Sequence, residues 1–478
     1  MPIREVDVAI IGAGTAGMGA YRAARKHTDK LVLIEGGPYG TTCARVGCMP
    51  SKLLIAAADA AEAVRQAAGF GVHATAPRVD GAEVMARVGR ERDRFVGFVL
   101  EAVEAIDPAN RLKGVARFED RHTLRLDTGE VLRAARIVVA AGAVPVRPKA
   151  FDAVGDRLIV NDDVFGWTDL PKAVAVFGGG VLGLELAQAL HRLGVRVRLF
   201  GKGGGVGQLS DPAVRKAAAA AIGADLPFDP DADVQGIARK GDEVIVRFTE
   251  DGKSREERFE WLLAATGREP AIDGLNLAAS GLSLDGRGLP KVDPLTMQTE
   301  GGHIFFAGDV AARIPLLHEA ADDGRIAGDN AGRFPEVIMH PRRTPLAIAF
   351  TDPNIATVGA SFSELSDASR DFAIGEVDYT DQGRARVIRQ NRGLLRVYGE
   401  RGTGLLLGAE MVAPGGEHLA HLLAWAVQAG MDVDTALAMP FYHPVIEEGL
   451  RTALRDLSLN LGRRSEIPPR SIDCGPGG

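Results

Sequence analysis

The chain has 478 residues, carries a formal net charge of −7 and is 46% hydrophobic, with 59 glycines. This length exceeds what one ordinary hydrophobic core organises, so we expect three or four domains, and the apolar content with abundant glycine and alanine fits an α/β enzyme. The charge pattern offers no basic tract for nucleic acid, no run of eighteen or more apolar residues could span a bilayer, and Met1 is not followed by a signal-peptide core. We therefore expect a soluble, cytoplasmic protein with neither nucleic acid nor a membrane as partner.

The first predicted unit is a buried strand over 6–11, a glycine-rich turn, an alanine-rich helix to about His27 and a second strand that ends at Glu35. Glycines at the turn let the backbone approach a pyrophosphate at the helix N-terminus, and the later acid can bind ribose hydroxyls. The turn glycines are Gly12, Gly14 and Gly17. The segment is therefore predicted to be a dinucleotide-binding βαβ unit.

Two of the three cysteines, Cys43 and Cys48, follow five positions apart. Five residues of ideal helix advance about 7.5 Å, whereas a relaxed disulfide needs Cα atoms about 4.4–6.8 Å apart. The helix must therefore be distorted if the two residues bond, and Gly47 and Pro50 both suit such a distortion. A bonded pair in a reducing compartment is typical of catalysis, and two buried structural thiols are the alternative. Lys52 would share the helix face of Cys48 and could stabilise a thiolate.

The next stretch is predicted to contain a polar surface segment over 75–94, a helix over 94–106 and several short strands. A strand over 136–139 then leads to Gly142. Pro145 and Pro148 follow and mark a domain boundary.

A second glycine fingerprint begins after a strand over 173–177 and enters a helix over 184–193 that carries Glu185. Its glycines are Gly178, Gly180 and Gly183. Two such units in one chain predict two dinucleotides and hence electron transfer between cofactors. Glu185 by itself is equally explained as a first-turn acid stabilised by the helix dipole.

The second strand of this unit, 195–200, ends at Gly201 and Lys202, where an acid would bind the 2′-hydroxyl of NAD. The missing acid removes repulsion of a 2′-phosphate and Lys202 could attract one, so NADP is as plausible as NAD. A flexible glycine loop is the other interpretation.

The chain then continues through a strand over 261–265 to Gly267 and a strand over 303–306 to Asp309. From Thr344 an α+β pattern predicts strands at 347–350, 355–358, 394–398 and 405–411 and helices at 418–429 and 445–457.

The stretch 40–52 resembles the redox-active signature of the flavin disulfide oxidoreductases, most nearly dihydrolipoyl dehydrogenases, with Thr41 in place of a glycine and Ala44-Arg45 in place of Leu-Asn. The segment around His443, Pro444 and Glu448 resembles the family's H-P-T-x-x-E, with valine replacing threonine. The resemblance extends to about Leu461. It implies an α/β fold with two Rossmann-like dinucleotide-binding domains, for FAD and NAD(P), and a C-terminal α+β dimerisation domain. The expected divisions are 1–150 (FAD and redox disulfide), 151–272 (NAD(P)), 273–343 (completing the FAD site), 344–461 (dimerisation) and 462–478 (a disordered tail).

The same resemblance implies a role for each matching residue and no metal site. Catalysis would fall to Cys43, Cys48, His443 and Glu448, with His443 acting as acid/base in the partner subunit of a homodimer. FAD would be held by Gly12, Gly14, Gly17, Glu35, Thr42, Lys52, Gly142 and Asp309, with Glu185 pairing with Lys52. NAD or NADP would be held by Gly178, Gly180, Gly183, Lys202 and Gly267.

The implied reaction is oxidation of a free or protein-bound dihydrolipoyl dithiol, for example on the lipoyl domains of a 2-oxo acid dehydrogenase complex. Gly201 and Lys202 favour an alternative, an NADPH-dependent reductase of a low-molecular-weight disulfide. Mercuric reductase is disfavoured, because the tail has one cysteine, Cys474, rather than a pair. The non-enzyme alternative is a flavin-bearing binding or redox-sensing partner of a larger assembly, with turnover incidental. The sequence leaves open the role of the tail and the direction of flux.

Overall fold

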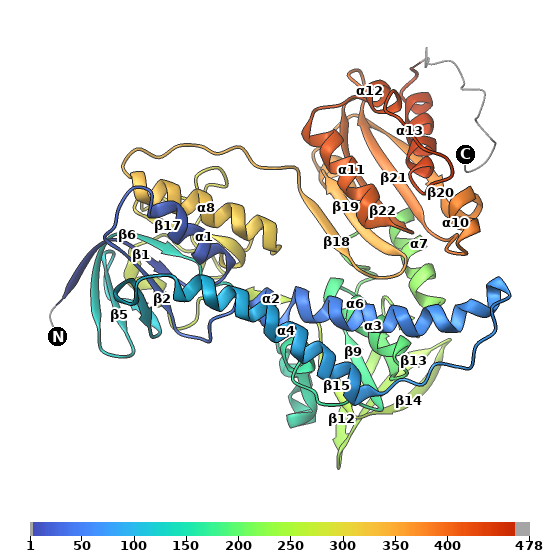
Figure 1. The fold of residues 1–478 in the computed structure, drawn as a ribbon, viewed down its shortest axis with the longest axis horizontal. Helices are drawn as coiled ribbons and strands as arrows, with labels where there is room; N and C mark the ends of the chain where they lie inside the picture. Colours follow the sequence, from blue (N-terminus) through green and yellow to red (C-terminus); the bar gives the residue numbers. More distant parts are fainter. Residues whose placement is uncertain (1–2, 464–478) are drawn as a thin grey trace. The chain divides into compact units, whose positions relative to one another are not determined.

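The computed structural model describes residues 3–463 (Figure 1). The chain divides into two compact units, each assembled from three separated segments. The first unit contains the described part of Met1–Leu53, with Ala86–Val146 and Gly267–Arg342; the second contains Leu54–Met85, Arg147–Thr266 and the described part of Arg343–Gly478. Cys474 and residues 464–478 of the predicted tail lie outside the described residues.

The first unit is built on a seven-stranded sheet. Its strands are β1 (Arg4–Ile11), β2 (Leu31–Glu35), β3 (Arg111–Lys113), β4 (Ala116–Phe118), β5 (Thr123–Leu126), β6 (Val131–Val139) and β17 (Ile304–Phe306). The order is β3-β2-β1-β6-β5-β4, with β17 paired to β6. All pairs are parallel except β4–β5 and β5–β6, which are antiparallel. The C-terminal half of β1, residues 8–11, is apolar and buried throughout, as a parallel sheet covered on both faces requires.

Two helices of this unit, α1 (Thr15–Ala24) and α8 (Leu317–Arg333), pack at unusually close range. Gly324 and Gly328 on α8 face the backbone of Ala16 and Ala20 on α1, and a Cβ at either glycine would overlap that backbone. Glycine is therefore required at both positions. This contact fixes α1, which begins at the first glycine fingerprint, against the C-terminal part of the unit.

The helices α2 (Thr42–Val46), α3 (Cys48–Gln66) and α4 (Gly81–Glu104) lie between β2 and β3 in the chain. The helix predicted over 94–106 is thus longer than expected and begins before the polar segment ends. Its first turns bury Met85 and Val88, which supply an apolar stripe among charged neighbours.

The part of the second unit over residues 147–266 has a five-stranded parallel sheet in the order β11-β10-β9-β15-β8. These strands are β8 (Leu158–Val160), β9 (Ala173–Phe177), β10 (Arg196–Phe200), β11 (Phe228–Asp229) and β15 (Trp261–Ala264), with helices α5 (Asn161–Val164), α6 (Val181–Arg192) and α7 (Pro212–Gly223). An antiparallel sheet of β12 (Asp233–Lys240), β13 (Glu243–Glu250) and β14 (Lys253–Phe259) packs beside it through ring contacts of Phe200 with Phe248 and Phe259.

The C-terminal part of the second unit is a five-stranded antiparallel sheet in the order β18-β19-β22-β21-β20. Its elements are β18 (Leu346–Ala349), β19 (Asn354–Gly359), α9 (Phe362–Asp367), β20 (Phe372–Asp378), α10 (Gly383–Val387), β21 (Leu394–Glu400), β22 (Leu406–Ala413), α11 (Gly416–Gln428), α12 (Val433–Leu437) and α13 (Glu448–Asn460). The helix predicted from 445 begins at Glu448, because the segment before it is held in an irregular conformation described below.

Buried Glu410 on β22 joins the two parts of this unit. Its carboxylate accepts the backbone N–H groups of Ser210 at 2.7 Å and Asp211 at 2.9 Å, just before α7, and that of Phe362 at 2.9 Å. A buried carboxylate is stable only when its oxygens are satisfied in this way.

Short elements complete the described chain. β7 (Ala143–Pro145) and β16 (Arg268–Pro270) form an antiparallel pair within the first unit. The single-turn and irregular helices are η1 (Ala67–Phe70), η2 (Pro108–Asn110), η3 (Lys149–Arg157), η4 (Leu277–Ser280), η5 (Gly308–Ala311) and η6 (Tyr379–Asp381).

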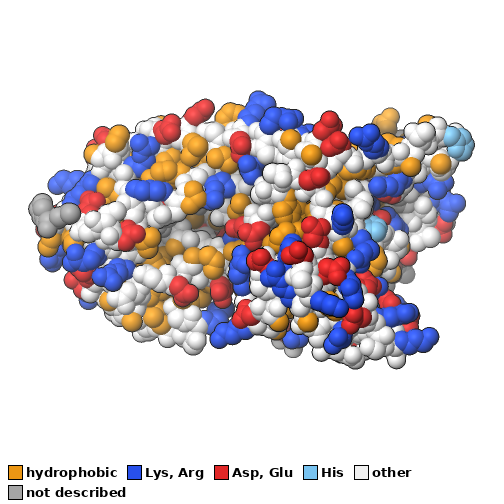
Figure 2. All heavy atoms as spheres, turned by 90° about the horizontal axis from the view of Figure 1, so that it is seen from below, with side chains coloured by type: hydrophobic (Ala, Val, Ile, Leu, Met, Phe, Trp, Pro, Cys, Tyr) orange, Lys and Arg blue, Asp and Glu red, His pale blue; other side chains and the backbone are white. Residues whose placement is uncertain are grey.

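The surface mixes both signs of charge with scattered apolar side chains (Figure 2). Three large apolar side chains of the C-terminal part are strongly exposed: Trp425 at 69%, Tyr442 at 79% and Leu459 at 74%. Between residues 3 and 463, none of the helices has the length and apolar character needed to cross a bilayer.

Candidate active site

The cysteine segment is a helix interrupted between its two thiols. α2 carries Cys43 and ends at Val46, and α3 begins at Cys48. Gly47 between them has φ −129° and ψ −118°, outside helical geometry. A Cβ at Gly47 would lie 3.1 Å from the Thr42 carbonyl oxygen and 3.2 Å from the Cys43 Cα, which leaves little room for a side chain. The expected distortion of the helix is therefore present, and it occurs at glycine.

The two thiols differ in environment. Cys43 is half-buried and Cys48 is exposed, so the pair is not a set of buried structural thiols. A hydrogen bond with the Cys48 side chain raises the pKa of the Cys43 thiol far above its ordinary value, and burial raises it further, whereas the charge of Lys52 acts in the opposite direction. This direction favours keeping the last proton of the dithiol on Cys43.

Thr41 begins this segment with a strained backbone. Its φ of 56° and ψ of 151° lie in a region that is essentially restricted to glycine, and threonine is β-branched. The Thr41 hydroxyl accepts the Ala44 N–H at 3.2 Å and caps α2, which partly offsets the strain. The position is the one at which the redox signature usually has glycine.

The first glycine fingerprint forms a close-packed turn with an open centre. Gly12 has φ 102°, and a Cβ there would overlap the Ala140 carbonyl; a Cβ at Gly17 would overlap the carbonyl of Gly12. Around Gly14, by contrast, a Cβ would meet nothing within 4 Å. The backbone at Gly14 is thus accessible at the start of α1, as approach of a pyrophosphate requires.

Glu35 stands at the end of β2 beside this turn. One carboxylate oxygen accepts the N–H of Ala13 at 2.7 Å and the other accepts the N–H of Gly37 at 2.6 Å. The acid therefore both completes the turn and leaves remaining lone pairs for ribose hydroxyls.

Two further predicted residues belong to the same unit. Gly142, after β6, has φ 74° and open space at its Cβ position. Asp309 in η5 is half-buried, and burial raises the pKa of its carboxyl, with the charge of Arg268 opposing the rise. A close-packed glycine turn, an open backbone at its centre and acids at two strand ends fit a dinucleotide such as FAD.

The second fingerprint repeats the first in detail. A Cβ at Gly178 would overlap the Ala265 carbonyl, and one at Gly183 would overlap the Gly178 carbonyl, whereas Gly180 has open space. Gly267, after β15, has φ 118° and is also open. This unit likewise fits a dinucleotide.

The end of β10 departs from the first unit. A Cβ at Gly201 would overlap the carbonyl group of Pro230, so no side chain fits there. The exposed Lys202 follows, and the N–H of Gly203 donates to the Asp231 carboxylate at 2.6 Å. The absence of an acid at position 201 is thus imposed by packing against the loop after β11.

Lys52 and Glu185 are each placed on the helix expected for them. Lys52 lies one turn after Cys48 on α3, and its Nζ donates to the Ser51 hydroxyl at 3.4 Å. Glu185 on α6 is buried and accepts the N–H of Phe350 at 2.8 Å. The two residues belong to different units, and their predicted pairing stays a prediction.

His443 and Glu448 lie together. The imidazole Nδ1 is 2.9 Å from one carboxylate oxygen of Glu448 and 3.1 Å from the other. Glu448 also accepts a hydrogen bond from the Arg451 guanidinium at 3.2 Å. The Glu448 side chain is 2% exposed, whereas the His443 side chain is 57% exposed. Because a carboxylate only accepts, the Nδ1 atom carries the proton and Nε2 is the atom left to exchange one.

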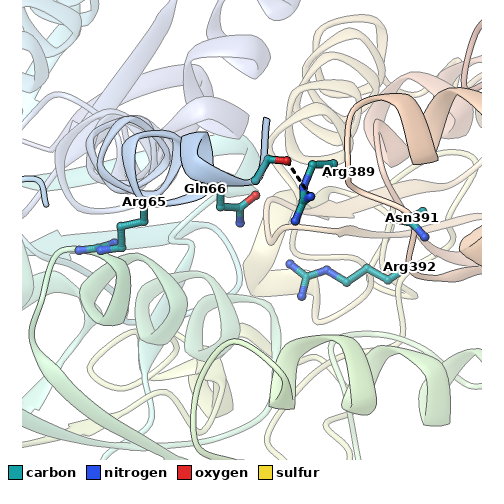
Figure 3. Close-up of a pocket in the computed structure, with 6 residues that line it drawn as sticks. Arg65, Gln66, Arg389, Asn391 and Arg392 are labelled. Atoms are coloured by element: carbon teal, nitrogen blue, oxygen red, sulfur yellow. Dashed lines mark hydrogen bonds between the residues drawn. The ribbon is translucent and has the colours of Figure 1, made fainter. Parts of the chain in front are cut away.

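A separate hollow in the second unit is basic. It has a volume of about 360 Å³ and is lined by Arg65, Gln66, Gly69, Arg389, Asn391 and Arg392 (Figure 3). Arg389 donates to the Gly69 carbonyl at 2.9 Å, within the short helix η1 that follows α3. None of the predicted site residues lines it. Among residues 3–463, no group of three or more His, Cys, Asp or Glu side chains could hold a metal ion.

Comparison with known proteins identifies the same architecture. Residues 6–324 match the family described as pyridine nucleotide-disulphide oxidoreductase, and 346–454 match the dimerisation domain of that family. The chain is 31% identical to dihydrolipoyl dehydrogenase of Haloferax volcanii over 460 residues, covering 94% of this chain and 95% of the relative. It is 30% identical to mercuric reductase of Streptomyces lividans over 478 residues, covering 96% and 98%.

Solved structures agree. LpdA from Mycobacterium tuberculosis superposes with a TM-score of 0.78 at 25% identity, covering 94% of this chain and 99% of that one. The HOCl-induced flavoprotein disulfide reductase RclA from Escherichia coli gives the same TM-score and coverage at 22% identity, a likeness of fold alone.

Proposed function

The chain belongs to the pyridine nucleotide-disulphide oxidoreductases, and we propose that it oxidises a dihydrolipoyl dithiol. Members of this family are FAD-dependent disulfide oxidoreductases that use NAD(H) and associate through their dimerisation domain. The observation that carries the proposal is the interrupted helix at Gly47, which brings the side chains of Cys43 and Cys48 into hydrogen-bond contact. The dihydrolipoyl dehydrogenases among its relatives supply the substrate class.

We assign the parts of the chain accordingly. Residues 1–150 bind FAD and carry the redox disulfide, 151–272 bind the nicotinamide dinucleotide, 273–343 complete the FAD site and 344–461 form the dimer. In the homodimer, His443 of one subunit serves the cysteines of the other. Exposed Trp425 and Tyr442 belong to the surface that the dimer would cover.

The chemistry begins with Cys43 and Cys48 joined as a disulfide. His443 Nε2 takes the proton of a substrate thiol, and the resulting thiolate attacks the Cys43 sulfur. A bond forms between substrate and Cys43 while the bond between Cys43 and Cys48 breaks, and Cys48 leaves as a thiolate. The second substrate thiol then gives its proton to the departing Cys43 sulfur and attacks the substrate sulfur bonded to Cys43. The bond between substrate and Cys43 breaks, so that Cys43 leaves as a thiol and the substrate leaves as a disulfide.

Other side chains hold the charges that this exchange creates. Lys52, one turn from Cys48, supplies a cation for the departing thiolate. The raised pKa of Cys43 keeps the remaining proton on Cys43, which leaves the negative charge on Cys48. Buried Glu448 stabilises the imidazolium that His443 becomes. FAD held at the first glycine fingerprint would supply the two-electron chemistry that links the dithiol to the nicotinamide.

The end of β10 supports a second candidate, an NADPH-dependent reductase of a small disulfide. Gly201 cannot carry the acid that would bind the 2′-hydroxyl of NAD, and Lys202 is exposed beside it. Similarity to a mercuric reductase also places a reductase among the relatives.

An anaerobic titration of the FAD-loaded protein distinguishes the two candidates. We expect dihydrolipoamide to produce the long-wavelength absorbance of a thiolate beside flavin, and NAD⁺ to discharge it. The same band with NADPH but not with dihydrolipoamide would replace the first proposal by the second. Retention of FAD with no dithiol or disulfide turnover would instead indicate a redox sensor.

The cysteine variant Cys43→Ser tests the exchange mechanism. We expect dithiol turnover to be lost while FAD stays bound and NADH still reduces ferricyanide, because that reaction needs no thiol. Substantial residual dithiol turnover would overturn the assignment of Cys43.

A further inference from the structure

The segment that carries His443 has little regular structure of its own. Residues 438–447 lie between α12 and α13 without helix or strand. Over 440–445 the backbone hydrogen bonds found in the described structure are both made at Val445. Its N–H donates to Glu448 Oε2 at 3.1 Å, and its carbonyl accepts Gln382 Nε2 at 2.8 Å. Packing of Phe441 and Ile446 against the core holds the segment on either side of His443, and the hydrogen bonds at Val445 fix its backbone next to His443.

Gln382 is a buried residue whose side-chain amide is hydrogen-bonded at both ends. It is 1% exposed and caps the N-terminus of α10, where its Oε1 accepts the N–H of Ala385 at 2.7 Å. The Ala385 partner is a donor and the Val445 partner is an acceptor, so only one orientation of the amide satisfies both. Leaving either group unsatisfied in this buried place would cost free energy.

Tyr379, three residues before Gln382, adds a contact between this segment and α13. Tyr379, fully buried, packs so tightly on Gly449 that a Cβ there would lie 2.9 Å from the phenol ring. Gly449 directly follows Glu448, the partner of His443. Segment 379–382 thus contacts the His443 loop on one side of Glu448 and the start of α13 on the other.

We propose that Gln382 is a positioning residue: its amide holds the Val445 carbonyl and thereby keeps His443 Nδ1 on the Glu448 carboxylate. The inference rests on the proposed role of His443 as acid/base. Gln382 itself touches neither substrate nor cofactor. Loss of its N–H donor would let the loop relax, and a displacement of about 1 Å in a catalytic group can cost on the order of 100-fold in rate.

The variant Gln382→Glu separates positioning from capping. Above neutral pH the carboxylate still accepts the Ala385 N–H and caps α10, but it cannot donate to Val445. Gln390→Glu is the matched control, because Gln390 is exposed on the same segment and the chemical change is identical.

We expect Gln382→Glu to lower kcat for dihydrolipoamide by roughly 10- to 100-fold with a smaller change in KM. NADH-to-ferricyanide turnover, which needs FAD and nucleotide but no thiol proton transfer, should stay near that of the parent. Gln390→Glu should match the parent in both assays. A role in capping alone would leave Gln382→Glu active with dithiol, and that result would overturn the proposal.

His443→Gln completes the set. If it abolishes dithiol turnover while Gln382→Glu remains fully active, only the positioning role fails. If His443→Gln itself keeps dithiol turnover, the proposed acid/base role fails and the inference falls with it. An equal loss in both the dithiol and the ferricyanide reactions of Gln382→Glu would indicate a general structural defect and would also count against positioning.

Discussion

The two βαβ units of this chain share their glycine geometry and differ at the end of the second strand. In each unit, the first glycine (Gly12 or Gly178) has no room for a Cβ because a backbone carbonyl of a neighbouring strand end lies there. The third glycine (Gly17 or Gly183) packs on the carbonyl of the first, and the middle glycine (Gly14 or Gly180) has open space at the helix N-terminus. The first unit ends its second strand in Glu35, which accepts two backbone N–H groups, whereas the second ends in Gly201, which has no space for a side chain. The geometry of the glycine turn and the presence of an acid at the end of the second strand are therefore separable features.

The largest effects should come from filling the shared turn. We expect Gly17→Val to abolish flavin retention, because its side chain would overlap the Gly12 carbonyl. Gly183→Val should retain flavin but lose reduction by NADH and NADPH, since the same overlap then occurs at Gly178. Flavin absorbance after purification and rapid-mixing reduction measure the two losses. Loss of flavin in both variants would show that the units do not act separately.

Glu35→Gln tests the acid that only the first unit has. Glu35 is proposed to accept a ribose hydroxyl of FAD, and losing one such charge-assisted hydrogen bond, worth about 2 kcal/mol, should raise the Kd for FAD roughly 30-fold. Reconstitution of the FAD-free protein, followed by fluorescence quenching, gives the value. Glu104→Gln, an exposed site on α4, is the matched control. An unchanged Kd would mean that Glu35 serves the turn alone.

Gly201→Glu tests whether the second unit can accommodate an acid at the end of its second strand, as the first unit does with Glu35. We expect the glutamate side chain to overlap Pro230 and to lower the free energy of unfolding by about 1–3 kcal/mol. The ratio of kcat/KM for NADH to that for NADPH should not increase. Gly205→Glu, where a Cβ meets nothing within 4 Å, should be tolerated. Thermal unfolding and initial rates with both nucleotides check this. A stable variant with raised NADH preference would show that the loop after β11 can move to make room for a side chain at position 201.

The smallest effect is expected at Lys202. An exposed cation near a 2′-phosphate contributes about 1 kcal/mol in water, so Lys202→Ala should lower kcat/KM for NADPH relative to NADH by roughly five-fold. The difference should shrink at high salt. Lys216→Ala on α7 serves as the exposed control. A ratio that does not move would exclude Lys202 from cofactor choice.

The sequence predicts those features whose signal is local. Both glycine fingerprints, the strands beside them and the break between Cys43 and Cys48 depend on neighbouring residues, and the structure has each of them. The membership of the family is likewise confirmed by comparison over most of the chain. The assignment of roles to individual site residues stays a prediction.

Features set by distant partners were missed. β20 was not predicted, because Gly375 interrupts its apolar alternation where a side chain would overlap α13. β14 is almost wholly polar, and it forms because β13 pairs with it through a buried face that includes Val246 and Phe248. The tie from Gln382 to Val445 spans 63 positions of sequence, and neither residue has a composition that signals it.

The assembly of each unit from three separated segments has a consequence for synthesis. Strand β6 of the first sheet ends at Val139, but its neighbour β17 and the helix α8 that packs on α1 are translated only after residues 147–266 of the second unit. At about 5–20 residues per second, the incomplete sheet must wait on the order of ten seconds on the ribosome with residues 137–139 of β6 unpaired on the side that β17 later occupies. The nascent chain is therefore most exposed to misassembly and to chaperones in this interval, and newly made protein should acquire flavin only after residues 304–333 have emerged.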